Sequence, residues 1–193
     1  MKKIRAIITD LIIKVFNPLS KPRMLLLKTN FQGIKIENCT IGNTTFIDYQ
    51  NKLILHHNTY IGHHNYIEAS NEIEIGEGCQ ITNFVNLTTH SSHISIRLYG
   101  NQYKNHSNHI GYLKGSIYIG KYSFIGPHSV IMPNTHIGKG SIVSAFSYVK
   151  GIFPDYSIIA GTPAIVIGDT RNKDEEFLNA NPELLIFYNN WNN

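Results

Sequence analysis

Cysteine is scarce in this sequence, with only Cys39 and Cys79 among 193 residues. They lie two periods apart in the 20-residue repeat described below. Neighbouring turns of a stacked β structure are about 4.8 Å apart, so two turns would separate the cysteines by about 10 Å, beyond the roughly 7 Å limit for a disulfide. We therefore expect two small core residues in a reducing compartment.

Long apolar runs are also lacking, since no run of about 18 uncharged apolar residues occurs and no transmembrane span is predicted. The best candidate, residues 4–16, is interrupted by Asp10 and Lys14, and no small-residue cleavage site follows it. It predicts an amphipathic helix rather than a secretory signal. The surrounding arm is basic, because Asp10 is its one acidic residue before Lys28, whereas its basic residues are Lys2, Lys3, Arg5, Lys14, Lys21, Arg23 and Lys28.

Two roles for this arm stay open, because a basic amphipathic helix suits an anionic membrane surface and an apolar helix face suits the open end of a β fold. The expected location is the cytoplasm, including the inner face of the membrane.

Acidic residues are absent from Gly78 to Pro154, whereas six cations fall in that stretch: Arg97, Lys104, Lys114, Lys121, Lys139 and Lys150. A positive field over this half of the chain is expected, and it favours phosphates or an anionic ligand.

Aliphatic residues, by contrast, recur every six positions: Ile119, Ile125, Ile131, Ile137, Val143 and Val149. An earlier block has a period of 20, as in Ile41, Ile61 and Ile81. A six-residue period fits neither a helix nor an alternating strand, but it suits a short strand and tight turn forming one side of a triangular coil. The aliphatic side chains would then stack inside as ladders. The sequence predicts an all-β parallel β-helix.

The period stops between Leu87 and Ile117, where a long insertion separates the two blocks. This insertion contains His90, His93, His106 and His109, and it also contains tyrosines 99, 103 and 112. Insertions of this length are functional or disordered, and the aromatic content favours an ordered loop beside a site.

Over about residues 34–168 the pattern resembles the left-handed β-helix acyltransferases of the maltose, galactoside and polysaccharide O-acetyltransferase type. The handedness comes from the resemblance alone, since the general crossover rule favours the right hand. The expected organisation is a helical arm or cap at 1–33, a β-helix domain at 34–168 with an extruded loop at 88–116, and a helical tail at 169–193. The tail has an apolar stripe and is expected to pack on its own or a neighbouring β-helix.

The step Thr89-His90 stands where the family places its catalytic histidine, so the resemblance implies that His90 removes the proton of the acceptor hydroxyl. An imidazole with an ordinary pKa near 6.5 suits this task. The alternatives are His93 as the base, or a plain surface histidine. Candidate acceptor contacts are Asn83, Asn86, His93 and Phe124.

A carboxylate that orients His90 cannot come from the acid-free stretch. It would have to come from the coil above or from another subunit, or a backbone carbonyl would replace it. Subtracting one 20-residue coil from Thr88 and His90 gives Glu68 and Ser70. Glu68 is therefore a candidate orienting group, the alternative being a solvated turn carboxylate.

Residues 159–164, I-A-G-T-P-A, resemble the family's closing motif beside coenzyme A. The resemblance implies acetyl-CoA as donor, bound between subunits of a homotrimer past Gly126 and Ala145, with Lys150 and Arg171 near its phosphates. The closing motif supplies the remaining candidate contacts, which are Ala160, Gly161, Thr162 and Pro163. Ile165 departs from the family, where a basic residue often follows P-A. No metal and no nucleic-acid partner are expected.

The leading hypothesis is O-acetylation of a carbohydrate hydroxyl on a surface glycan or its precursor. N-acetylation of a nucleotide-linked amino sugar is the alternative. A zinc enzyme of the γ-carbonic-anhydrase type is a distant one, because His63 and His64 have no histidine one coil later at Asn83 and Phe84. A non-catalytic scaffold or ice-binding β-helix would need neither the histidine loop nor the closing motif.

Overall fold

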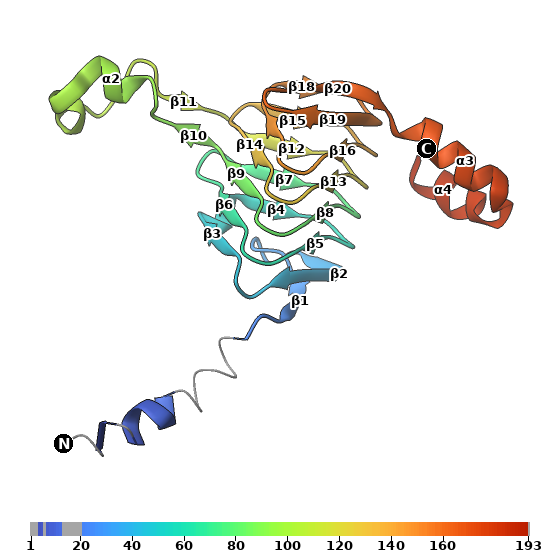
Figure 1. The fold of residues 1–193 in the computed structure, drawn as a ribbon, viewed down its shortest axis with the longest axis horizontal. Helices are drawn as coiled ribbons and strands as arrows, with labels where there is room; N and C mark the ends of the chain where they lie inside the picture. The colour runs from blue at the N-terminus through green and yellow to red at the C-terminus, as the bar shows by residue number, and fades with distance from the viewer. Residues whose placement is uncertain (1–3, 6, 13–20, 193) are drawn as a thin grey trace.

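The computed structural model describes residues 4–5, 7–12 and 21–192. Its strands form three long sheets that wrap around one core (Figure 1). Sheet A contains, in spatial order, β1 (Met24–Thr29), β2 (Lys35–Gly42), β5 (Tyr60–Ile61), β8 (Gln80–Ile81), β13 (Phe124–Ile125), β16 (Ile142–Val143), β19 (Ser157–Gly161) and β20 (Ala164–Asp169). Sheet B contains β3 (Phe46–Asp48), β6 (Tyr66–Glu68), β9 (Asn86–Thr88), β14 (Val130–Ile131) and β17 (Tyr148–Val149).

Sheet C contains β4 (Leu53–Leu55), β7 (Ile73–Ile75), β12 (Ile117–Ile119), β15 (Thr135–Ile137) and β18 (Ile152–Phe153). A separate pair is formed by β10 (His90–Ser91) and β11 (Leu113–Lys114). The helical segments are η1 (Gln50–Lys52), α2 (Ser95–Tyr99), η2 (Gly100–Asn105), α3 (Thr170–Ala180), η3 (Pro182–Leu184) and α4 (Leu185–Asn192).

The coil register follows the periods of the sequence. Ile61 pairs in parallel with Ile81, one period of the earlier block further on, whereas Ile125 pairs with Val143, three hexads further on. Ile81 pairs with Ile125 across the insertion, so the coil continues as though the loop were not there. The predicted parallel β-helix of hexapeptide repeats is confirmed.

The core is the stack of aliphatic side chains predicted from the period. Ile61, Ile81, Ile125 and Val143 are at most 1% exposed. Burying one such side chain contributes about 1.5–3 kcal/mol, so the ladders carry most of the stability. Cys39 and Cys79 are also buried, and both are free, as predicted.

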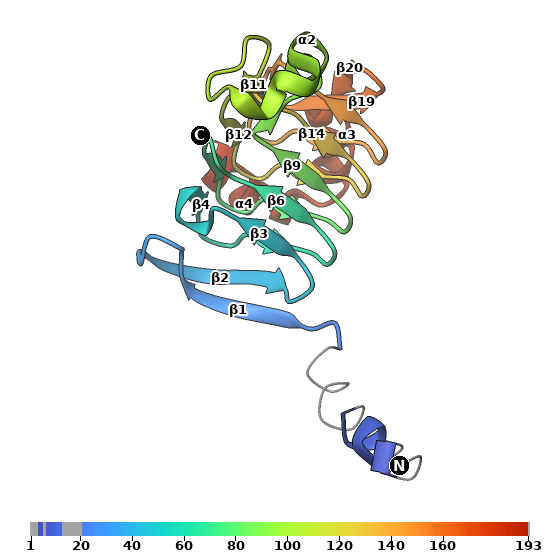
Figure 2. The same ribbon diagram turned by 90° about the vertical axis from the view of Figure 1, so that its left-hand side faces the viewer.

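Each end of the coil is closed by an antiparallel strand, β1 on β2 and β20 on β19. Strand β1 lies within the segment expected to be a helical arm, and Leu27 and Phe31 pack against the core there. Figure 2 shows the helix of residues 7–12 well separated from β1. Ile7 and Leu11 are more than half exposed, so this helix does not cap the coil.

Residues 6 and 13–16 of the predicted amphipathic helix, and Lys2 and Lys3 of the basic arm, lie outside the described residues. Among the residues that the structure does describe, no helix is long and apolar enough to cross a membrane.

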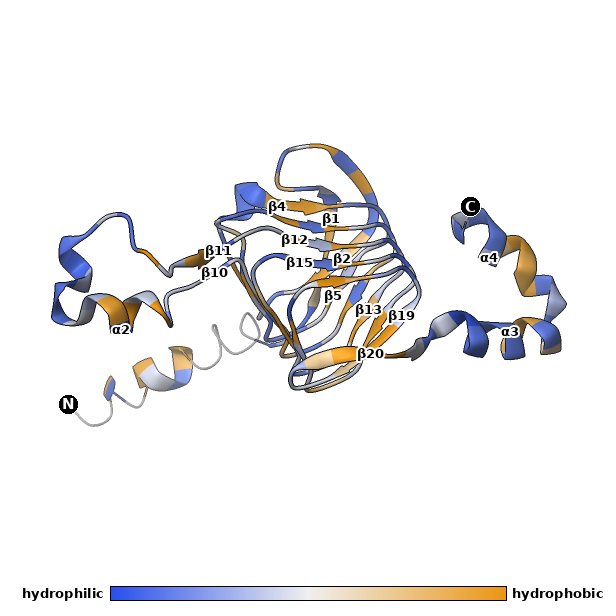
Figure 3. Cartoon of the chain, turned by 90° about the horizontal axis from the view of Figure 1, so that it is seen from above, coloured by the Kyte–Doolittle hydropathy of each residue, from blue (hydrophilic) through white to orange (hydrophobic). Residues whose placement is uncertain are grey.

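The C-terminal helices α3 and α4 project from the coil on the side opposite to α2, as Figure 3 shows. Trp191 contacts Tyr122, with ring centroids 4.8 Å apart, and Lys139 Nζ donates to the carbonyl of Asn192 at 2.6 Å. The tail therefore packs on its own β-helix through its last turn. Ile186 and Phe187 remain more than 60% exposed.

Candidate functional site

The insertion emerges between the end of β9 and the start of β12, at the edge where sheet B meets sheet C, here called the B–C edge. Its base is the antiparallel pair β10–β11, in which His90 faces Lys114 and Ser91 faces Leu113. Beyond this pair the chain forms α2 and η2, here called the loop lobe together with the segment up to β11. The insertion is therefore ordered, as its aromatic content predicts.

His90 lies within hydrogen-bond distance of a buried carboxylate from the preceding coil. His90 Nδ1 lies 2.8 Å from Glu68 Oε2, and the Glu68 side chain is 2% exposed while that of His90 is 36% exposed. The geometry follows from the register, because Glu68 pairs with Thr88 across neighbouring coils. Glu68 is therefore the partner found by subtracting one coil, and the alternative of a solvated turn carboxylate is wrong.

Glu68 is held as a carboxylate by four donors. Its oxygens accept from Ser70 N at 2.9 Å, from Thr89 N at 3.0 Å and from Thr89 Oγ1 at 2.8 Å, in addition to His90. Burial by itself raises the pKa of Glu68, but the hydrogen bonds from Ser70 and Thr89 outweigh it and lower the pKa from 4.5 to about 2. A carboxylate can only accept, so neutral His90 donates Nδ1–H to it and keeps a lone pair on Nε2.

An aromatic chain leads from His90 into the loop lobe. The rings of His90 and Tyr112 are stacked with centroids 5.6 Å apart, and His109 stacks on Tyr103 at 3.9 Å. His109 Nε2 donates to the Tyr103 carbonyl at 2.7 Å. Burial raises the pKa of Tyr112, with smaller contributions from Tyr103 and Glu68, so its phenol stays neutral. Beside this chain lies a pocket of about 310 Å³ lined by Ser107, Asn108, His109, Tyr112 and Lys114.

A second set of candidate residues gathers at the edge where sheet A meets sheet B, here called the A–B edge. Gly126 N donates to Val143 O at 2.8 Å, and a Cβ on Gly126 would lie 2.6 Å from Ala145 N. Gly161 N donates to Ser147 Oγ and Thr162 Oγ1 to Phe146 O, both at 3.3 Å. Gly126, Ala145, Gly161 and Thr162 thus lie in successive coils of one edge, with Pro163 following and Ala160 in β19. Because these residues have small or no side chains, a ligand could approach the backbone along this edge.

The two candidate phosphate contacts lie elsewhere. Lys150 follows β17 and is exposed at the B–C edge. Arg171 binds Asp169 through two nitrogens, Nε to Oδ1 at 3.0 Å and Nη2 to Oδ2 at 2.6 Å, and it packs over the Tyr156 ring. The structure does not bring Arg171 to the A–B edge, because this neighbouring carboxylate holds the guanidinium at the start of α3.

The candidate acceptor contacts are dispersed within one chain. Asn86 lies on sheet B between Tyr66 and Val130, and its buried Oδ1 has no hydrogen-bond partner among the described residues. Asn83 Oδ1 accepts from His63 N at 2.7 Å.

Of the other two candidate contacts, His93 is exposed and its Nδ1 pairs with Ser91 Oγ at 2.7 Å. Phe124 lies on the outer face of sheet A, with 38% of its surface exposed. None of the hydrogen bonds or ring contacts of the described residues joins Phe124 or His93 to His90.

Tyr112 and Lys114 were missed by the sequence analysis as site residues. The tyrosine-rich composition of the insertion was the available signal for Tyr112. Nothing in the spacing pairs His90 with Lys114, because the insertion has no period.

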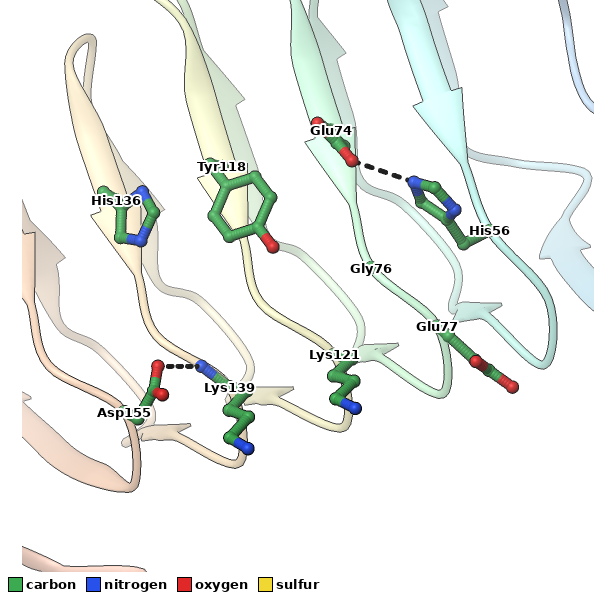
Figure 4. A pocket seen from close by; sticks show the side chains of 9 residues that line it. All are labelled: His56, Glu74, Gly76, Glu77, Tyr118, Lys121, His136, Lys139 and Asp155. Atoms are coloured by element: carbon green, nitrogen blue, oxygen red, sulfur yellow. Dashed lines mark hydrogen bonds and ion pairs between the residues drawn. The ribbon is translucent and has the colours of Figure 1, made fainter. Parts of the chain in front are cut away.

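A larger hollow of about 460 Å³ lies on the outer face of sheet C (Figure 4). It contains a second histidine–glutamate pair, His56 Nε2 to Glu74 Oε1 at 2.9 Å, and the rings of Tyr118 and His136 stack beside it. Both members of this pair are more than a third exposed. Exposed pairs of this kind contribute little to stability, and Glu74 is far more exposed to solvent than Glu68. Within the described residues, no group of three or more side chains could hold a metal ion.

The family model described as bacterial transferase hexapeptide (six repeats) matches residues 116–151. The chain is 27% identical over 157 residues to the galactoside O-acetyltransferase of Escherichia coli strain K12, covering 80% of this chain and 72% of that protein. The chain is an acyltransferase that contains hexapeptide repeats and is similar to this relative.

A second relative of this acyltransferase is the dTDP-4-amino-4,6-dideoxy-D-glucose acyltransferase of Escherichia coli, which is 24% identical over 156 residues, covering 76% of this chain and 78% of that one. Among solved structures, the N-acyltransferase AntD from Bacillus cereus, in complex with dTDP and 3-hydroxybutyryl-CoA, has a TM-score of 0.60 at 22% identity, covering 80% of this chain and 90% of that chain. At that identity the likeness shows the fold of this acyltransferase.

Proposed function

We propose that this acyltransferase transfers an acetyl group from acetyl-CoA to a hydroxyl of a carbohydrate, with His90 as general base, and that the carbohydrate belongs to a surface glycan or its precursor. The observation that carries the proposal is the pair of His90 with the buried carboxylate of Glu68. Because Nδ1–H is committed to Glu68, the lone pair on Nε2 is available to an acceptor hydroxyl.

In the proposed reaction, Nε2 takes the proton of the acceptor hydroxyl while its oxygen attacks the thioester carbonyl carbon. The tetrahedral intermediate collapses, the carbon–sulfur bond breaks and the thiolate leaves. The imidazolium of His90 then returns its proton to the sulfur, giving the acetyl ester and free coenzyme A. Buried Glu68 stabilises the imidazolium between the two proton transfers and keeps the ring in one tautomer.

The donor is proposed to lie along the A–B edge, where Gly126, Ala145 and Gly161 expose closely packed backbone. His90, however, lies at the B–C edge of the same chain. A donor site on one edge and a base on another supports a homotrimer in which each active site forms between two subunits. Lys150, exposed at the B–C edge, would then face the donor of a neighbouring chain.

N-acylation of an amino sugar linked to a nucleotide is the second candidate. The similarity to an acyltransferase named for dTDP-4-amino-4,6-dideoxy-D-glucose supports it. A hydroxyl needs a general base more than a neutral amine does, so the ordered Glu68–His90 pair favours the hydroxyl.

The test is thiol release from acetyl-CoA with panels of oligosaccharides, neutral sugars, acidic sugars and dTDP-linked amino sugars, with mass spectrometry of the product. We expect an acetyl ester, and we expect His90→Ala to reduce kcat by about 10²–10⁴-fold with little change in fold. His93→Ala is the matched control. Full turnover by His90→Ala would remove His90 from this role, and an amide product would favour the second candidate.

We also infer that the coils are left-handed and that the chain is organised as an N-terminal arm and cap at 1–33, of which β1 forms the cap, a β-helix domain at 34–168 and a helical tail at 169–193. Similarity to the hexapeptide-repeat acyltransferases supports the handedness. Strand β2 begins at Lys35 and strand β20 ends at Asp169, which supports the limits of the β-helix domain. We further propose that the basic residues of the arm contact the inner face of an anionic membrane peripherally.

A further inference from the structure

The side chain opposite His90 in the β10–β11 pair is Lys114. Directly opposed residues of an antiparallel pair project from the same face, with Cβ atoms about 5 Å apart. The ammonium of Lys114 therefore belongs to the same surface as the imidazole of His90. The loop brings this cation beside the base from a distant position in the sequence.

The backbone of Lys114 is fixed by the coils around it. Asn134 Nδ2 donates to the carbonyl of Lys114 at 3.1 Å, and Gly115 N donates to the carbonyl of Thr89 at 3.0 Å. The side chain is exposed, and none of the ion pairs formed by the described residues involves it. Glu68, which lies behind His90, is already committed to His90 and Thr89. Lys114 thus has an anchored backbone and an exposed ammonium that forms no ion pair with the described residues.

Lys114 also lines the pocket of about 310 Å³ in the loop lobe, a volume within the range of small-ligand sites. Tyr112 lines the same pocket and stacks on His90, so a sugar ring held there would lie next to the base. Ser107, Asn108 and His109 add polar groups that can bond hydroxyls. The pocket therefore combines an aromatic wall, hydrogen-bonding groups and one positive charge.

Resting on the proposed function, we propose that this loop pocket is the acceptor subsite and that Lys114 makes it selective for an acidic sugar. The acceptor would carry a carboxylate or a phosphate next to the hydroxyl that is acetylated. Lys114 is a specificity-determining residue in this scheme, and His90 remains the base. A charge-assisted hydrogen bond from the ammonium to the anion orients the sugar, with its neighbouring hydroxyl directed to His90 Nε2.

The experiment compares matched acceptors that differ in charge: the methyl glycosides of galactose, galacturonic acid and galactose 6-phosphate, and the corresponding glucose series. Thiol release from acetyl-CoA gives kcat and KM for the full-length protein and for Lys114→Gln, Lys114→Arg and Lys104→Gln. Lys104 lies in η2 of the same loop lobe and does not line the pocket, so it is the matched control.

We expect the wild type to prefer an acidic member over its neutral partner, and Lys114→Gln to reduce that preference about tenfold, chiefly through KM. Lys114→Arg should retain most of the preference and Lys104→Gln all of it. The carboxylate and phosphate arms show which anion is used. Equal losses on acidic and neutral acceptors in Lys114→Gln, or a wild type that prefers the neutral sugar, would overturn the proposal.

Failure of the proposed acetyl transfer can be distinguished from failure of the acceptor subsite. If no sugar of any panel stimulates thiol release by the wild type, acetyl transfer to carbohydrate is rejected. Saturation-transfer NMR with galacturonic acid and galactose then tests the subsite without turnover. Binding of the acid that Lys114→Gln abolishes supports the subsite, whereas equal signals from both sugars or both proteins reject it.

Discussion

Replacing Glu68 with glutamine tests the buried pair with the least change of shape. Glutamine offers one oxygen and one NH₂ group where the carboxylate offers two oxygens. Oε2 of Glu68 accepts from Thr89 N, Thr89 Oγ1 and His90 Nδ1, so an NH₂ group in its place would face three donors. With the amide oxygen at the Oε2 position instead, the NH₂ group would face Ser70 N, so at least one donor loses its partner in either orientation, and the negative charge beside His90 is lost in both.

The cost in stability follows from the pKa of Glu68, which falls from 4.5 to about 2 on folding. At about 1.4 kcal/mol per pKa unit, the charged group contributes about 3 kcal/mol to the free energy of unfolding at neutral pH. Because the pKa of the folded state is depressed, this contribution is fully present above pH 4.5 and disappears as the pH falls toward 2. Glu68→Gln should lower the melting temperature at pH 7 by about 6–12 °C.

The assay is urea unfolding followed by circular dichroism at pH 7 and at pH 3, together with thiol release at pH 7. Wild type and Glu68→Gln should differ by about 3 kcal/mol at pH 7 and by clearly less at pH 3. The value of kcat should fall by about 10²–10⁴-fold because an uncharged glutamine no longer stabilises the imidazolium of His90.

Glu74→Gln is the matched control, since Glu74 pairs with His56 at 2.9 Å but is 37% exposed. We expect it to cost less than about 1 kcal/mol and to leave turnover unchanged. The reasoning is refuted if the two variants lose equal stability at pH 7, or if the deficit of Glu68→Gln is the same at both pH values.

Two further predictions concern the scaffold. Gly126→Ala places a Cβ 2.6 Å from Ala145 N and from Val143 O, so the coils must separate, and we expect a loss of about 1–3 kcal/mol in thermal or urea unfolding; an unchanged melting temperature would show that the A–B edge is looser than described. Ile131→Ala removes a side chain that is 0% exposed, and we expect it to lower the free energy of unfolding by about 2–5 kcal/mol in urea unfolding. Ile152→Ala, at 83% exposure, should lower it by less than about 0.5 kcal/mol. Similar losses from the two variants would contradict the assignment of the core.

The repeat could be predicted from the sequence because the core imposes it. Each coil must present an aliphatic side chain at the same place, so Ile125 and Val143 keep their spacing whatever happens at the surface. Glu68 was found in the same way, since one period before Thr88 is its parallel neighbour in the structure. Its burial could not be predicted, because that depends on the donors Ser70 and Thr89 converging on its carboxylate.

Contacts outside the coil could not be predicted from spacing. The pairing of His90 with Lys114 depends on an antiparallel register that no period encodes. Strand β1 adds to the edge of sheet A by backbone hydrogen bonds, which leave no pattern of side chains in the sequence. The prediction of a helical arm at 1–33 therefore missed this strand. Arg171 was expected near the phosphates of coenzyme A from the family resemblance, but in the structure its guanidinium binds the neighbouring carboxylate of Asp169.

The pairing of Ile81 with Ile125 across the insertion gives the fold a separable part. The coils before and after the loop meet as they would without it, and the segment from Ser92 to Tyr112, beyond the β10–β11 ladder, takes no part in their pairing. Loops of other lengths and compositions could be grafted at this junction if they kept the short β10–β11 ladder that begins with His90. Evolution or a protein engineer could thus change which acceptor is chosen by exchanging one cassette, while Glu68 and the β-helix stay as they are.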